Sequence, residues 1–145
     1  QIILVESFAP IKCKKIFYIR TKSQDFLLMH NFKKLDIWIN SLELSKFIYL
    51  KTAQFPKEEQ FGLISQIRRS SISIVSNIAE GSGRGSDKEF SRFLDISIAS
   101  SFELETQLIL SKELNYLSLE DFDKLEKELQ SIQKMIFGFK KNLIK

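Results

Sequence analysis

Apolar residues recur at intervals of three and four along most of the chain, the spacing that places them on one face of an α-helix. The pattern predicts four helices, at about 32–53, about 58–80, 87 to about 114, and 119–143. No alternation of apolar and polar residues typical of a strand competes with it. The sequence therefore predicts an all-α fold.

The fourth helix has the most regular apolar face, which steps by three and four at Phe122, Leu125, Leu129, Ile132, Ile136, Phe139 and Leu143. The first helix has two apolar stripes. We expect the core to take Leu35, Trp38, Leu42, Ser45, Tyr49 and Thr52, and we treat Ile37, Leu44 and Ile48 as a second stripe. This second stripe, together with Ile109 and Leu110, indicates either a wide core or a subunit interface.

Short connections separate the helices, so consecutive helices should pack as antiparallel neighbours in an up-down-up-down bundle. Pro56 lies near the start of the second helix. Gly81 is placed to end that helix in a left-handed conformation. Ser86 and Glu89 have the spacing of a capping box for the third helix.

Charge is distributed unevenly along the chain. The net charge is +4, and residues 1–28 hold five basic and two acidic side chains, which leaves +1 for residues 29–145. We interpret Met29 as the natural start of a 29–145 bundle domain. Residues 1–28 are then an extension that is either non-native or weakly ordered.

Composition also bears on the compartment. No apolar run reaches the roughly 18 residues that a membrane-spanning helix requires. Cys13 is the single cysteine and cannot form an internal disulfide. We therefore expect a cytoplasmic protein with no membrane association.

Residues capable of catalysis are sparse. The single histidine, His30, precedes the first helix without a partner motif, and no Glu-x-x-His pair of the di-iron bundle type is present. No Cys/His cluster indicates zinc. We expect no catalytic residues, no metal and no cofactor, and hence no enzyme.

Arginines provide the candidate binding residues. Arg68 and Arg69 are adjacent and point about 100° apart on a helix, so one can face solvent while the other packs inward. They either pair with a carboxylate such as Glu105 or bind phosphate. The glycine-rich loop around Arg84 is either a flexible turn or an anion-binding nest at a helix N-terminus. Asn77 and Glu80 favour a structural hydrogen-bond network.

Many of these residues together form a pattern that resembles the motifs of one bacterial four-helix-bundle family. The resemblance covers about residues 30–143 and is most specific in Asn77-Ile78-Ala79-Glu80-Gly81 after the paired arginines. Its other matching positions are Phe55-Pro56, Glu59, Gly62-Leu63, Gln66, Ser73, Arg84, Phe90, Phe93-Leu94, Ser100 and Glu103-Leu104-Glu105. The family includes proteins encoded in intervening sequences of 23S ribosomal RNA genes and the accessory protein of diversity-generating retroelements.

The resemblance implies a four-helix protomer that assembles into a ring, commonly a homopentamer, without catalytic activity. Its usual proposed partner is RNA, and in the retroelement branch also a reverse transcriptase. We therefore expect a homo-oligomer that associates with structured RNA through Arg68, Arg69, Arg84 and Arg92. The alternatives are a protein-interaction scaffold or a reverse-transcriptase accessory protein.

Overall fold

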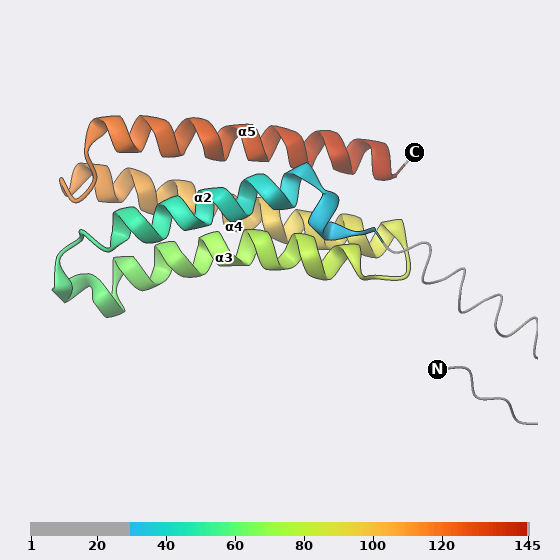
Figure 1. Ribbon diagram of the computed structural model, residues 1–145, viewed down its shortest axis with the longest axis horizontal. Coiled ribbons are helices and arrows are strands. Elements are labelled where there is room, and N and C mark those ends of the chain that lie inside the picture. The colour runs from blue at the N-terminus through green and yellow to red at the C-terminus, as the bar shows by residue number, and fades with distance from the viewer. Residues whose placement is uncertain (1–29, 145) are drawn as a thin grey trace, which may run out of the picture. The chain divides into compact units, whose positions relative to one another are not determined.

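The computed structural model describes residues 30–144, and the fold below belongs to the unit Asn31–Lys145. Within the described residues the chain is all-helical, without strands, as the sequence predicts. Figure 1 shows the long helices side by side, joined by short connections. The elements are η1 (Phe32–Lys34), α2 (Asp36–Thr52), η2 (Lys57–Phe61), α3 (Leu63–Ser82), α4 (Asp87–Glu113) and α5 (Leu119–Leu143). No helix in this part of the chain has the length and apolar character needed to cross a bilayer.

Polar side chains cap the start of three helical elements, where backbone N–H groups lack helical partners. The Asn31 side chain accepts a hydrogen bond from the Lys33 N–H at the start of η1. The Ser86 hydroxyl accepts from the Glu89 N–H at the start of α4, and Ser118 accepts from Asp121 at the start of α5. The Ser86 cap lies where the sequence places it.

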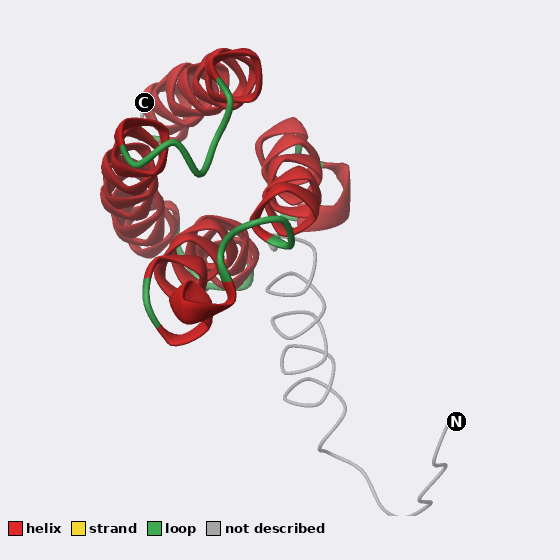
Figure 2. Cartoon of the chain, turned by 90° about the vertical axis from the view of Figure 1, so that its left-hand side faces the viewer, coloured by secondary structure: helices red, strands yellow, loops and turns green. Residues whose placement is uncertain are grey.

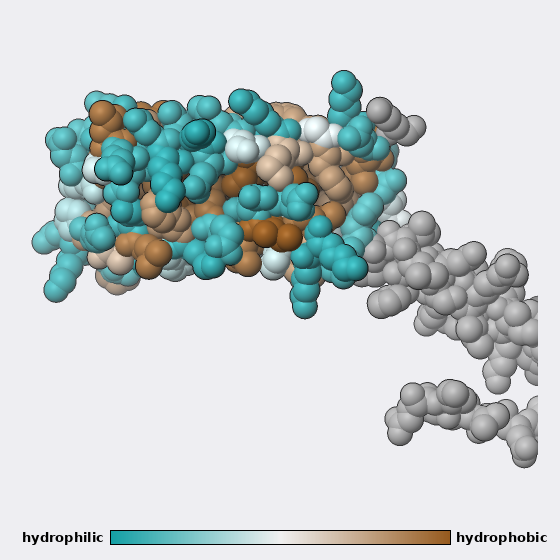
Figure 3. Space-filling view, turned by 45° about the horizontal axis from the view of Figure 1, so that its top comes forward, coloured by the Kyte–Doolittle hydropathy of each residue, from teal (hydrophilic) through white to brown (hydrophobic). Residues whose placement is uncertain are grey.

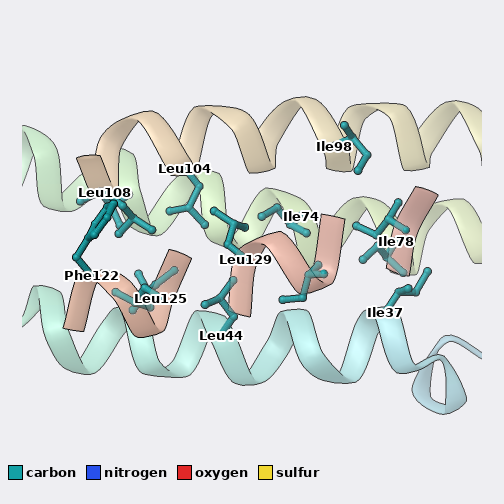
Figure 4. Close-up of a cluster of buried hydrophobic side chains, with 14 of the residues drawn as sticks. Ile37, Leu44, Ile74, Ile78, Ile98, Leu104, Leu108, Phe122, Leu125 and Leu129 are labelled. Carbon is teal, nitrogen blue, oxygen red and sulfur yellow. The ribbon is translucent and has the colours of Figure 1, made fainter. Parts of the chain in front are cut away.

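The four helices enclose one hydrophobic core. Helix α3 packs on α2 and α4, and α5 packs on α4 and α2, so that each helix has two neighbours. Figure 2 shows the helices around a common centre, and Figure 4 shows the side chains that fill it. Buried core residues include Ile37, Leu44, Ile48, Ile64, Ile67, Ile74, Ile78, Phe90, Leu94, Leu104, Leu108, Phe122, Leu125, Leu129, Ile132 and Ile136.

Both apolar stripes of α2 contribute to the core, and Leu35 and Trp38 pack against it. Ile37, Leu44 and Ile48 are buried, whereas Tyr49 is 43% exposed. The prediction that Tyr49 faces the core is therefore wrong, although Ser45 and Thr52 are buried as expected. The small Ser45 side chain accounts for this orientation of α2. It lies against α3, where its hydroxyl donates a hydrogen bond to the Ser71 carbonyl.

Helices α3 and α4 approach each other closely through small residues. Ser97 on α4 is fully buried and its hydroxyl donates to the Ile74 carbonyl on α3 at 3.2 Å. Gly81 lies inside α3 against α4, where an added Cβ would come within 2.6 Å of both Phe90 Cδ2 and Phe93 Cβ.

The expectation that Gly81 ends the helix in a left-handed conformation is wrong. Helix α3 continues to Ser82, and no glycine in residues 30–144 has a positive φ. Glycine is required at this position because α4 leaves no room for a side chain.

Candidate nucleic-acid interface

Two of the predicted structural residues lie in hydrogen-bond networks between helices. The Asn77 amide donates to the Ser73 carbonyl at 2.8 Å, and the Ser73 hydroxyl lies 2.8 Å from the Ser100 hydroxyl on α4. This arrangement joins α3 to α4 and supports the structural interpretation of Asn77. Asn77 is half-buried, and the hollows in the described part of the chain are lined by other residues.

Glu105 joins α4 to α5 and does not pair with the arginines. Its carboxylate accepts a hydrogen bond from the amide of the buried Gln133 at 3.0 Å. Within residues 30–144, neither Arg68 nor Arg69 forms an ion pair. The expected arginine–Glu105 pair is therefore absent there, because Glu105 is bound to α5.

Arg84 is held by two neighbours at the end of α3. Its guanidinium forms an ion pair with Glu80, four residues earlier, and lies 4.6 Å from the centre of the Phe93 ring. The carboxylate partially neutralises the guanidinium, and the acidic residues Asp87 and Glu89 follow in the first turn of α4. The side chain is nevertheless 44% exposed, so that an anion could still approach it.

The four candidate arginines do not form a single cluster. Arg92 is exposed in the second turn of α4, near the same end of the bundle as Arg84. Arg68 and Arg69 lie in the first half of α3, about 14 residues or roughly 20 Å along the helix axis from its end. The molecule therefore has two separate basic areas.

Arg68 and Arg69 differ in environment, as their helical spacing predicts. Arg68 is half-buried: its Nε donates to the Thr52 hydroxyl at 2.9 Å, and its guanidinium stacks 4.6 Å from the centre of the Tyr49 ring. Arg69 is exposed. One arginine is thus fixed in place, while its neighbour extends into solvent.

These arginines line a hollow of about 450 Å³ at the ends of α2 and α3. The other lining residues are Tyr49, Gln60, Phe61, Ile64, Ser65 and Ile72. No carboxylate lines the hollow, so the two guanidinium groups give it a positive potential. A concave site with two cations, an amide and a hydroxyl suits an anionic ligand.

A second hollow of similar size adjoins the first and shares Tyr49 and Ile72 with it. Its other lining residues are Leu42, Ser45, Lys46, Leu50 and Ala53, and it is almost entirely apolar. Leu50 is 68% exposed beside it. Exposed apolar side chains also occur on other faces of the molecule, and Figure 3 shows brown patches among hydrophilic side chains on one of them.

Sequence reasoning missed Phe61 and Tyr49 as parts of this surface. Phe61 is 94% exposed, the most exposed of the large apolar side chains described. A signal was available, because Phe61 lies outside the regular core positions of α3, which begin at Ile64 and Ile67. Tyr49 had no such signal, since its spacing fits a core stripe.

Clusters of potential metal ligands are also absent from the described region, where no group of three or more His, Cys, Asp or Glu side chains comes together. Cys13, the single cysteine, lies outside the described residues. The surface features are thus arginines and apolar hollows on a four-helix scaffold.

Within residues 30–144, fold and surface define a four-helix protein whose candidate binding groups are arginines on α3, on α4 and in the loop between them. The chain belongs to the 23S rRNA-intervening sequence protein family, whose model matches residues 33–138. It is also similar to the crystal structure of a protein of unknown function from the S23 ribosomal protein family of Bacteroides thetaiotaomicron VPI-5482. That likeness has a TM-score of 0.66 and 25% identity, covering 72% of this chain and 98% of the other. The comparison with curated proteins finds no match.

Proposed function

We propose that this protein is a non-enzymatic, homo-oligomeric protein that binds phosphates of structured RNA through surface arginines. The observation that carries the proposal is the hollow in which Arg68 and Arg69 lie without a carboxylate. The family's description supports RNA rather than another polyanion as the partner. Arg84 and Arg92 form a second, weaker contact area, since Glu80 already pairs with Arg84.

Oligomerisation is the second part of the proposal. Residues 29–145 carry a net charge of only +1, so each protomer offers few phosphate contacts. Several copies on one RNA multiply such weak contacts through effective concentration. The short connections support an up-down-up-down protomer, and the family resemblance favours a ring of five.

The apolar hollow around Leu50 is the proposed contact between copies. A second chain that covers this apolar surface removes it from water, and this burial stabilises the complex of the two chains. Leu50→Glu should therefore reduce the molar mass measured by sedimentation, while helix content stays unchanged. Leu119→Glu is the matched control, because Leu119 is 65% exposed and lies outside this hollow. Equal masses for both variants would assign the subunit contact to another face.

The test of RNA binding is a salt series with the full chain, an RNA hairpin and a DNA duplex of equal length. Phosphate contacts predict that log Kd varies linearly with log salt, with a slope of about 0.7–0.9 per phosphate neutralised. Arg84→Ala should fold normally, because an exposed ion pair contributes about 0–1 kcal/mol, and should reduce the slope by about one phosphate. An unchanged slope would mean that the glycine-rich loop around Arg84 is only a turn and does not contact phosphate.

A protein-interaction scaffold is the second candidate, and the apolar hollow is the observation that favours it. Under that function the same full chain would not bind either nucleic acid at low salt, although its oligomer remained intact. That combination would exclude the RNA proposal.

A further inference from the structure

We propose that the hollow lined by Arg68, Arg69 and Phe61 binds an unpaired nucleotide of RNA, stacking its base on the Phe61 ring and pairing its phosphate with Arg69. This inference rests on the proposed RNA-binding function and specifies which feature of the RNA is recognised. Unpaired bases expose a flat face that duplex bases bury in their stack, and proteins bind such bases on aromatic rings.

The exposed ring is held by an ordered turn. Phe61 ends η2, and the following Gly62 N–H donates to the Glu59 carbonyl at 3.0 Å. The Glu59 carboxylate accepts from the Leu63 N–H at 2.9 Å, which fixes the first turn of α3. A side chain at position 62 would displace this carboxylate from the Leu63 N–H, since an added Cβ would lie 2.6 Å from Glu59 Oε2. The backbone therefore presents Phe61 to solvent from a defined position.

The cationic side of the hollow is also organised before any ligand arrives. Arg68 is held by the Thr52 hydroxyl and by stacking on the Tyr49 ring. Its charge stays at the wall of the hollow, since the guanidinium has no carboxylate partner within the described residues. Arg69, one position further along α3, is exposed and can reach a phosphate oxygen.

The remaining lining groups suit a nucleotide better than a peptide or a lipid. The Gln60 amide and the Ser65 hydroxyl can donate to and accept from polar atoms at a base edge. The volume of about 450 Å³ lies within the range of small-ligand sites. The absence of a carboxylate from the lining gives charge complementarity to phosphate, whereas the surface of the hollow next to it is almost entirely apolar.

The test compares two RNA duplexes that differ by one nucleotide. One is fully paired, and the other contains a single bulged 2-aminopurine whose fluorescence reports stacking. The full-length protein should bind the bulged duplex more tightly and change its fluorescence. Phe61→Leu keeps an apolar side chain but removes the ring, and should weaken binding of the bulged duplex about 5- to 100-fold. The same substitution should leave binding of the paired duplex unchanged.

Two further variants serve as controls, and a third tests the phosphate contact. Phe61→Trp keeps an aromatic face and should retain the preference for the bulge. Phe102→Leu removes a different exposed phenylalanine, which lies on α4 outside the hollow, and should have no effect. Arg69→Ala should weaken binding of the bulged duplex and reduce its salt slope.

The outcomes separate this site from the general function. If both duplexes bind equally and Phe61→Leu changes neither, the unpaired-nucleotide site is wrong while RNA binding stands. If neither duplex binds at low salt, both proposals fail. If Phe61→Leu lowers the sedimentation mass and leaves RNA affinity unchanged, the exposed ring belongs to a contact between copies of the chain.

Discussion

Substituting Gly81 by alanine tests the close packing of α3 against α4. The added Cβ would lie 2.6 Å from Phe90 Cδ2 and from Phe93 Cβ, whereas ordinary contacts begin at 3.4 Å. The Phe90 ring is 1% exposed and packs against the Phe139 ring, so it has no space into which to rotate. The Phe93 Cβ is bonded directly to the backbone of α4. The first two turns of α4 must therefore move by roughly 0.8 Å.

The expected magnitude is a difference between two effects. Overpacking of this kind costs about 1–3 kcal/mol. Alanine is favoured over glycine inside a helix by up to about 1 kcal/mol, and by less near a helix end such as Ser82. We therefore expect Gly81→Ala to lower the free energy of unfolding by about 1–2 kcal/mol.

Urea unfolding followed by the helical circular dichroism signal measures this change. The midpoint should fall while the m-value stays constant, and all variants should be compared at one protein concentration because subunit association adds stability. Gly138→Ala in α5 is the matched control, since nothing lies within 4 Å of an added Cβ there. That variant should gain about 0.5–1 kcal/mol. The reasoning is refuted if Gly81→Ala is as stable as the wild type or if both substitutions stabilise equally.

Three further substitutions test other contacts. Arg68→Ala should lower the free energy of unfolding by about 1–2 kcal/mol, because it removes a hydrogen bond and the stacking on the Tyr49 ring. Arg69→Ala should stay within about 0.5 kcal/mol of wild type in urea unfolding. Equal losses would contradict the environments assigned to the two arginines. Lys51 on α2 pairs with Asp121 on α5 at 2.6 Å and lowers the pKa of that carboxyl, mainly through their hydrogen bond. A lowered folded-state pKa gives stability that is present above the unfolded value of about 3.9 and lost as pH falls through the folded value. Asp121→Asn should thus cost about 0.5–1 kcal/mol at pH 7 and almost nothing below the folded-state pKa; a difference that persists in acid would assign the effect to something other than charge.

The helices were predictable where a single apolar stripe fixed the orientation. The apolar face of α5 has one spacing that satisfies every position, and Phe122, Leu125 and Leu129 are buried accordingly. Helix α2 offered two stripes of comparable size. Its orientation depends on the shape of α3, where Ser71 admits Ser45 closely, and that complementarity between distant segments has no signature in the local pattern.

Gly81 shows a second limit of local reasoning. A glycine before a glycine-rich loop is equally compatible with a left-handed helix end and with a close helix contact, because both require the absence of Cβ. Only the position of Phe90 and Phe93 on the next helix decides between them. The packing role therefore emerges from the tertiary structure.

The candidate interface combines predictable and unpredictable parts for the same reason. Helical geometry alone indicates that Arg68 and Arg69 point in different directions, but not which of them is anchored. Tyr49 decides this, since its exposed ring provides a surface on which Arg68 can stack. Had α2 buried Tyr49, Arg68 would lack this support. The orientation of α2 thus links the core to the surface, because Tyr49, which the core leaves exposed, lines both hollows beside α3.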